Sequence, residues 1–170
     1  MCSSTRPAGA GTYGSRYIFA YIERSTVSTQ IRMGFTVRPD VNLDVYAEPF
    51  ASSGRYYDFG ELMRAGGRER LLYGAAGTSV DLQASGDRIV TTGDGTFTLK
   101  NRDFNLRSMR SNVVLRWEWR PGSTLYLVWQ QNRELRRDVG TSAGFADVFH
   151  SLTAPGSNFL SVKTSFWLPR

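Results

Sequence analysis

The sequence predicts an all-β protein: an antiparallel, up-and-down meander of about six long strands, forming part of a transmembrane outer-membrane β-barrel. Three observations favour this fold. Long segments alternate apolar and polar residues, as strands with two unlike faces do. One strand–corner–strand unit occurs twice, as IRMGFTVRPDVNLDVYAEPF and VVLRWEWRPGSTLYLVWQQN. No apolar run approaches the ~18 residues that a membrane helix needs, so a bilayer could be crossed only by a barrel.

Each repeated unit turns at an Arg-Pro corner. The two corners are Arg38-Pro39-Asp40 and Arg120-Pro121-Gly122. Proline fixes φ at the first turn position and Asp or Gly accepts the second, so the turn chemistry agrees with a hairpin. We expect both corners to be short periplasmic turns, because the long connections fall at the opposite end of the strands, as in outer-membrane barrels.

The expected elements follow in chain order. Residues 1–15 are expected to be a disordered or linker segment, and residues 16–170 the C-terminal barrel segment. An Arg-Ser-Thr link separates the first two strands. The approximate strand ranges are 16–23, 27–37, 42–52, 104–119, 124–132 and 159–168.

Two long extracellular loops are expected, over residues 53–102 and 133–158. In the first, GELMRAGGRERLLYG suggests a short helix, and DRIVTTGDGTFTLK a small hairpin around Gly93-Asp94-Gly95. Weak strand pieces near 78–82 and 89–99 would raise the count to eight, the smallest closed bacterial barrel. The last strands of a larger barrel, preceded by a signal peptide and further sequence, are the favoured interpretation.

Charged side chains recur on the polar face of these strands. The candidates to face a polar lumen are Arg32, Glu48, Arg110, Arg116, Glu118 and Lys163. Their mixed signs would either brace the wall through ion pairs or bias the passage of a charged solute. Aromatic residues gather near the Arg-Pro end, where amphipathic rings favour a membrane interface; these are Trp117, Trp119, Phe166 and Trp167.

Composition excludes several other classes. The net charge of +6 is spread along strands as arginine, which is typical of a solvated surface, and no nucleic-acid partner is expected. Cys2 and His150 are the only residues of their types, so no disulfide or cysteine cluster forms within the chain. No motif supplies a catalytic, metal-binding or cofactor-binding site, and we do not expect an enzyme.

One stretch, RDFNLRSMRSNVVLRWEWRPGSTLYLVWQQ, together with NLDVYAEPFASSGRYYDFGEL and the closing strand, resembles the C-terminal part of a bacterial family, domain-of-unknown-function family 5916. The resemblance covers residues 16–170. It implies a surface protein in which a carbohydrate-binding-like module precedes an outer-membrane barrel. It carries over no catalytic motif, and any glycan role would belong to the upstream module.

The expected function is therefore a non-enzymatic membrane anchor or pore wall in the bacterial outer membrane. Its partners would be membrane lipid, lipopolysaccharide and the barrel-assembly machinery, with a glycan bound through the upstream module. The alternative is a soluble β-rich module whose basic loops, including RELRRD, bind an anionic ligand. Protein cover over the apolar face distinguishes the two, and the residues that report it are Leu115, Trp117, Leu125 and Leu127.

Overall fold

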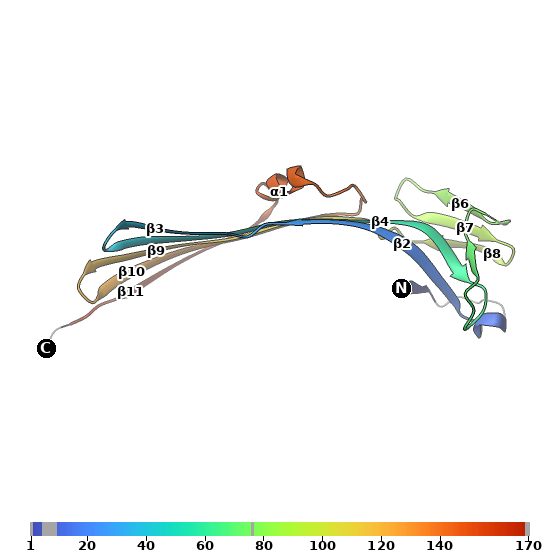
Figure 1. Ribbon diagram of the computed structural model, residues 1–170, viewed down its shortest axis with the longest axis horizontal. Helices are drawn as coiled ribbons and strands as arrows, with labels where there is room; N and C mark the ends of the chain where they lie inside the picture. Colours follow the sequence, from blue (N-terminus) through green and yellow to red (C-terminus); the bar gives the residue numbers. More distant parts are fainter. Residues whose placement is uncertain (1, 5–9, 76, 169–170) are drawn as a thin grey trace. The chain divides into compact units, whose positions relative to one another are not determined.

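The computed structural model describes residues 2–4, 10–75 and 77–168, and it is an all-β structure with antiparallel strand pairing and one short helix (Figure 1). This confirms the all-β, antiparallel part of the predicted fold class. The strands are β1 (Cys2–Ser4), β2 (Arg16–Ser28), β3 (Ile31–Arg38), β4 (Val41–Leu62), β5 (Arg70–Leu72), β6 (Ser79–Leu82), β7 (Arg88–Thr92), β8 (Gly95–Leu99), β9 (Phe104–Arg120), β10 (Ser123–Arg137) and β11 (Gly156–Ser165). A 3₁₀ turn, η1 (Ala10–Thr12), and a helix, α1 (Phe145–Ser151), complete the described elements.

The larger sheet has the strand order β1-β2-β4-β9-β10-β11, with β3 and β5 also paired to β4. The expected Arg-Ser-Thr link between two separate strands is wrong, because β2 continues through these residues to Ser28. Only Thr29 and Gln30 separate β2 from β3, and the Thr29 N–H donates to the Pro49 carbonyl of β4 at 3.1 Å. This segment contains no Gly, Pro, Asn or Asp, the residues that favour a turn. The first two expected strands therefore follow one another along the same side of β4.

The chain divides into two compact units, which we describe separately. Unit 1 comprises Met1–Arg24, Gly54–Phe104 and Asp138–Thr141. Unit 2 comprises Ser25–Ser53, Asn105–Arg137 and Ser142–Arg170.

Unit 1 contains a separate three-stranded sheet, β6-β7-β8, and an apolar core of Ile18, Val90 and Phe97. The expected hairpin is present, with Thr92 paired to Gly95 across the Gly93-Asp94 turn. Because β6, β7 and β8 form their own sheet, they do not add strands to the larger one. The less favoured alternative, in which these pieces raise the barrel count to eight, therefore does not hold for the described residues.

The expected loop over 53–102 is largely ordered strand. β4 extends to Leu62, and β5 pairs with it through Gly60, which faces Leu72 in the register. No helix forms in GELMRAGGRERLLYG: after β4 the chain bends at a glycine pair, where Gly66 has a φ of 72°. Glycine pairs disfavour helix and permit this left-handed turn. Residues 1–15 are described in part. They contain β1, which pairs with β2, and the short η1 turn.

Unit 2 is built from β4, β9, β10 and β11 in that order, with β3 on the outer side of β4. Both Arg-Pro corners are two-residue hairpin turns, since Arg38 pairs with Val41 and Arg120 with Ser123. The corners lie side by side, because the Glu118 N–H donates to the Asp40 carbonyl at 2.8 Å. β3–β4 and β9–β10 thus turn at one end of the sheet, where the described C-terminal residues also lie (Figure 1).

The second expected loop, 133–158, is shorter than predicted. β10 continues through RELRR to Arg137, so these arginines lie on a strand and not in a loop. β11 begins at Gly156, and α1 lies in the connection between β10 and β11 along the chain. Arg107 of β9 forms an ion pair with Asp147 of α1, and the Ala143 N–H donates to Ser53 Oγ at 3.0 Å. The connection is therefore fastened to the sheet of unit 2.

We expect Gly122→Ala to destabilise the β9–β10 hairpin. Gly122 has a φ of 76°, and a Cβ placed there would lie 2.9 Å from the Cβ of Trp167. Backbone strain of this kind costs about 1–3 kcal/mol. The matched control is Gly93→Ala in the β7–β8 turn, where φ is not positive and an added Cβ would meet no atom within 4 Å. Equal shifts of the two variants in the denaturant midpoint would contradict the expectation.

Candidate functional site

One face of the unit 2 sheet is apolar, and we call it the apolar face. The strand register aligns Leu115, Leu127 and Val162 in one row across β9, β10 and β11. The next row in the same register is Val113, Trp129 and Leu160. On β3 and β4 the corresponding pairs are Met33 with Val45 and Phe35 with Leu43. Because alternate residues of a strand share a face, these rows form a continuous apolar surface on each set of strands.

Little protein covers this apolar face. Phe35 is 50% exposed, Trp117 42%, Leu160 63% and Val162 60%. Leu115, Leu125 and Leu127 are half-buried, as expected for side chains flanked by neighbouring strands in a single layer. Among the described residues of unit 2 there is no second sheet, and the only described helix there, α1, is fastened at the Arg107 end of β9.

The four candidate interface aromatics lie at the end with the Arg-Pro corners. The Trp119 ring lies edge-to-face against Trp117, at 6.3 Å between centroids, and against Phe166, at 5.4 Å. Trp167 lies beside Gly122, and its backbone N–H donates to Ser123 Oγ at 3.3 Å. Phe166 and Trp167 are 68% and 64% exposed. The rings of Trp117, Trp119 and Phe166 therefore form an aromatic cluster at one edge of the apolar face, and Trp167 lies beside the neighbouring turn.

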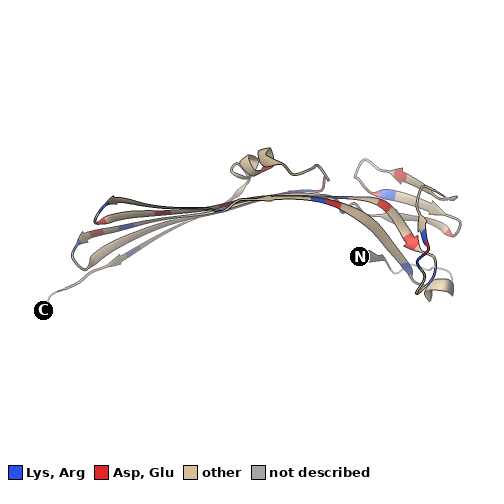
Figure 2. Ribbon diagram, in the orientation of Figure 1, with Lys and Arg blue, Asp and Glu red and all other residues tan. Residues whose placement is uncertain are grey.

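The opposite face of the same strands, which we call the polar face, carries the six charged candidates. Arg116 faces Tyr126, which in turn faces Lys163, and Arg110 faces Asn132. Arg32 faces Tyr46 across β3 and β4. Tyr46 and Glu48 of β4 line one surface hollow together with Arg110 and Asn112 of β9, so these residues of the two strands share the polar face. Figure 2 shows charges of both signs spaced along these strands.

Charged and aromatic groups on the polar face contact one another. The Arg32 guanidinium lies 5.4 Å from the centre of the Tyr46 ring. The Tyr46 hydroxyl donates to Glu48 Oε2 at 2.7 Å, and Arg116 Nη2 lies 3.6 Å from Glu118 Oε2. Arg110 and Lys163 form no ion pair with any described residue. The interactions join residues on one strand or on adjacent strands, so they stiffen the sheet locally.

The hollow on the polar face has a volume of about 480 Å³. Its lining includes three residues with side-chain amides that were not among the sequence candidates, namely Asn112, Gln130 and Asn132. The Asn112 Oδ1 atom is buried and accepts no hydrogen bond from the described residues. The alternation that identified Arg110 and Arg116 also places Asn112 on this face, so the pattern contained the signal.

Unit 1 contains a buried cluster around Arg16, which is 5% exposed. Arg16 Nε lies 3.1 Å from Glu61 Oε2, Nη2 lies 3.6 Å from Asp94 Oδ2, and the guanidinium is 4.7 Å from the centre of the Phe97 ring. Burial raises the pKa of the nearby Tyr73 hydroxyl above its ordinary value, and the negative charge of Glu61 raises it further. The cluster places a buried, paired charge against Phe97 of the apolar core, so its role is to hold the core of unit 1 together.

A second polar contact in unit 1 fastens the β7–β8 hairpin. Lys100 Nζ donates to Asp87 Oδ2 at 2.8 Å, and the Asn101 N–H donates to Asp87 Oδ1 at 2.8 Å. The hydrogen bond from Lys100, followed by that from Asn101, lowers the pKa of Asp87 below its ordinary value. Both hydrogen bonds favour the carboxylate, so their contribution to stability is present at neutral pH and is lost as the pH falls through the lowered pKa.

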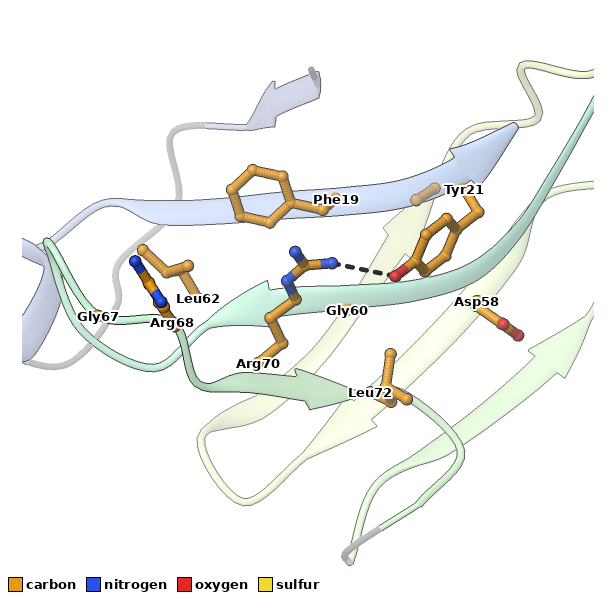
Figure 3. Close-up of a pocket in the computed structure, with 10 residues that line it drawn as sticks. Phe19, Tyr21, Asp58, Gly60, Leu62, Gly67, Arg68, Arg70 and Leu72 are labelled. Carbon is orange, nitrogen blue, oxygen red and sulfur yellow. Dashed lines mark hydrogen bonds between the residues drawn. The ribbon is translucent and has the colours of Figure 1, made fainter. Parts of the chain in front are cut away.

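Unit 1 also has a surface cavity of about 510 Å³ between β2, the end of β4 and β5 (Figure 3). We call it the unit 1 cavity. Its lining residues are Phe19, Ala20, Tyr21, Asp58, Gly60, Leu62, Gly67, Arg68, Arg70 and Leu72. Arg70 Nη1 donates to the Tyr21 hydroxyl at 3.3 Å. The sequence pattern does not reveal this cavity, because it predicts a short helix where β4 and β5 pair.

Two other kinds of site are absent from the described residues. No group of three or more His, Cys, Asp or Glu side chains there is arranged to hold a metal ion. None of the helices in the described part of the chain has the length and apolar character needed to cross a membrane. His150 lies on α1 and is exposed.

Comparison with known proteins identifies a family. No curated protein and no solved structure matches the chain. The sequence matches the family described as a domain of unknown function, DUF5916, over residues 6–169, which is nearly its whole length. The resemblance seen in the strand and corner motifs is thereby confirmed, and the chain belongs to the DUF5916 family.

Proposed function

We propose that unit 2 forms part of the wall of a bacterial outer-membrane β-barrel, with its apolar face against lipid and its polar face toward a polar lumen. The observation that carries this proposal is the uncovered apolar face. Water-exposed proteins rarely leave large contiguous apolar patches uncovered. A lipid environment removes that penalty, and alternation of apolar and polar residues is the pattern of barrel strands.

The extent of the apolar face supports the proposal. Ile31 to Val37 on β3, and Val113 to Trp119 on β9, each span six residue steps. At about 3.4 Å per residue, each stretch is about 20 Å long. With strands tilted by about 40°, as in outer-membrane barrels, it covers about 15 Å of the ~25 Å apolar band. The aromatic cluster at the Arg-Pro end matches the aromatic girdle at a membrane interface. In this proposal the corners are periplasmic turns.

The polar face is best explained as a braced inner wall. The Arg116–Glu118 ion pair and the hydrogen bond from Tyr46 to Glu48 connect its charged groups to neighbours. Such contacts rigidify a sheet whose side chains project into water. The role is non-enzymatic, and conduction of a solute along this face is a separate question that bilayer conductance of the whole parent protein would answer.

Closure of the wall into a barrel requires more strands than the described residues of unit 2 contain. β3 and β11 lie at the two edges of its sheet and have no described partner on their outer sides. Open edges are not tolerated in lipid, where no water is available to pair their backbone groups. We therefore propose that further strands complete the barrel. Membrane lipid, lipopolysaccharide and the assembly machinery are its proposed partners, and any glycan would bind outside this chain.

We expect the purified chain to aggregate in buffer and to become monodisperse in detergent micelles. The apolar face and the open edges are both sites of association in water. Size-exclusion chromatography with light scattering, at micromolar concentration with and without a neutral detergent, measures this directly. A monodisperse, detergent-free monomer would contradict the proposal and favour a soluble β-rich module.

A further inference from the structure

We propose that the unit 1 cavity binds a phosphate-bearing amphiphile, with the phosphate on Arg68 and Arg70 and the apolar body against Phe19, Leu62 and Leu72. This inference concerns unit 1 alone and goes beyond the wall function proposed for unit 2. It rests on the charge of the cavity, its apolar lining and the fixed position of one arginine.

The charged residues of the cavity lining are two arginines and one aspartate, so its net charge is positive. Arg68 and Arg70 both line it, and neither forms an ion pair with a described residue. Asp58 also lines the cavity, but its carboxylate points away from both guanidinium groups (Figure 3). The two guanidinium groups of this lining match the charge of a phosphate dianion, and each is a donor suited to phosphate oxygens.

The remainder of the lining is suited to an apolar group. Leu62 lies beside Arg68, Phe19 lies above the Arg70 guanidinium, and Leu72 lies to its lower right (Figure 3). The volume of about 510 Å³ is within the ~300–1,000 Å³ typical of small-molecule sites. Inorganic phosphate alone would leave most of this apolar surface in water, so the geometry favours a phosphate that carries an acyl or aromatic body.

Arg70 is partly preorganised for binding. Its hydrogen bond to the Tyr21 hydroxyl directs the guanidinium along the cavity (Figure 3). Tyr21 is itself held by stacking on Tyr57, at 5.9 Å between ring centroids and 27° between planes. A guanidinium that is already positioned loses less conformational entropy when an anion binds.

Isothermal titration calorimetry of the full chain in a neutral detergent tests the proposal. The probes are 1-naphthyl phosphate, dihexanoyl phosphatidic acid, inorganic phosphate and 1-naphthol. We expect at least one of the two amphiphilic phosphates to bind about tenfold more tightly than inorganic phosphate or 1-naphthol. The tighter of the two shows whether the body is aromatic or acyl. Binding of both no tighter than inorganic phosphate or 1-naphthol would overturn the proposal.

Substitutions locate the binding. Arg68→Gln and Arg70→Gln should each weaken binding of the preferred amphiphile about tenfold, whereas Arg64→Gln, which changes a neighbouring arginine outside the cavity lining, should not. For 1-naphthyl phosphate, affinity should also rise as the pH increases through about 6, where the second phosphate proton is lost. Unchanged binding in both cavity variants would overturn the assignment of the site. The ranking of probes on the unsubstituted chain holds even if a variant misfolds.

Discussion

Leu127→Arg is expected to destabilise the membrane-inserted protein by about 2–4 kcal/mol, the cost of an arginine near the middle of the lipid face of a barrel. Leu127 lies in the central row of the apolar face, between Leu115 and Val162. A guanidinium there would replace an apolar contact with a charge that no neighbouring side chain compensates. The measurement is the folded fraction of the protein in phospholipid vesicles across a urea series.

The adjacent residue provides the matched control. Val128 lies on the same strand but on the polar face, in a row with Val114 and Ser161. Val128→Arg should change stability by less than about 1 kcal/mol, because its side chain projects toward water and other polar groups. Equal losses in the two variants, or tolerance of Leu127→Arg, would contradict the assignment of the two faces.

The second large effect is expected in unit 1, where Glu61→Ala should cost about 3–5 kcal/mol. The Arg16 side chain is 5% exposed and that of Glu61 13%, so removing the carboxylate leaves a buried guanidinium without its nearest counter-charge. The pKa of Tyr73 should also decrease in this variant, because the Glu61 charge contributes to raising it, although burial keeps it above the ordinary value. Denaturant unfolding and absorbance titration of tyrosine measure the two effects.

Asp94→Ala is the control for this prediction. Asp94 is the other acidic partner of Arg16, at 3.6 Å, but its side chain is 75% exposed. Exposed ion pairs contribute between 0 and about 1 kcal/mol, so the loss should be several-fold smaller than for Glu61→Ala. If the two losses were the same, burial would not be the cause of the large effect.

Period-two alternation made most of unit 2 predictable. The Arg-Pro corners and the strands beside them followed from turn chemistry and from side-chain faces, which are local properties. The break between β2 and β3 was not predictable in the same way. Both segments alternate apolar and polar residues, and only their pairing with the 22-residue β4 shows that they lie one after the other on the same side of it. Pairing of that kind is a long-range property.

The sites depended on local signals to different degrees. All six charged candidates were placed on one face by alternation, and the structure brings Glu48 and Arg110 to the same hollow. The unit 1 cavity was missed because RERLL reads as helix when its charged and apolar residues are considered alone. Its conformation is set by pairing of Gly60 with Leu72, and a Cβ at Gly60 would lie 2.6 Å from the Leu71 carbonyl oxygen. In the sequence, only Gly60 itself indicates such a close backbone contact, because glycine within a strand often marks a site where another backbone approaches.

The exposure of successive β10 residues to lipid tests the proposed wall most directly. With Cys2 replaced by serine, single cysteines at positions 125 to 130 would carry a nitroxide label in the protein reconstituted in vesicles. We expect an alternating pattern: labels at Leu125, Leu127 and Trp129 collide with oxygen dissolved in lipid, and labels at Tyr126, Val128 and Gln130 collide with a water-soluble nickel complex. Labels at 125, 127 and 129 that are shielded from both reagents, or that collide mainly with the nickel complex, would contradict the proposed wall.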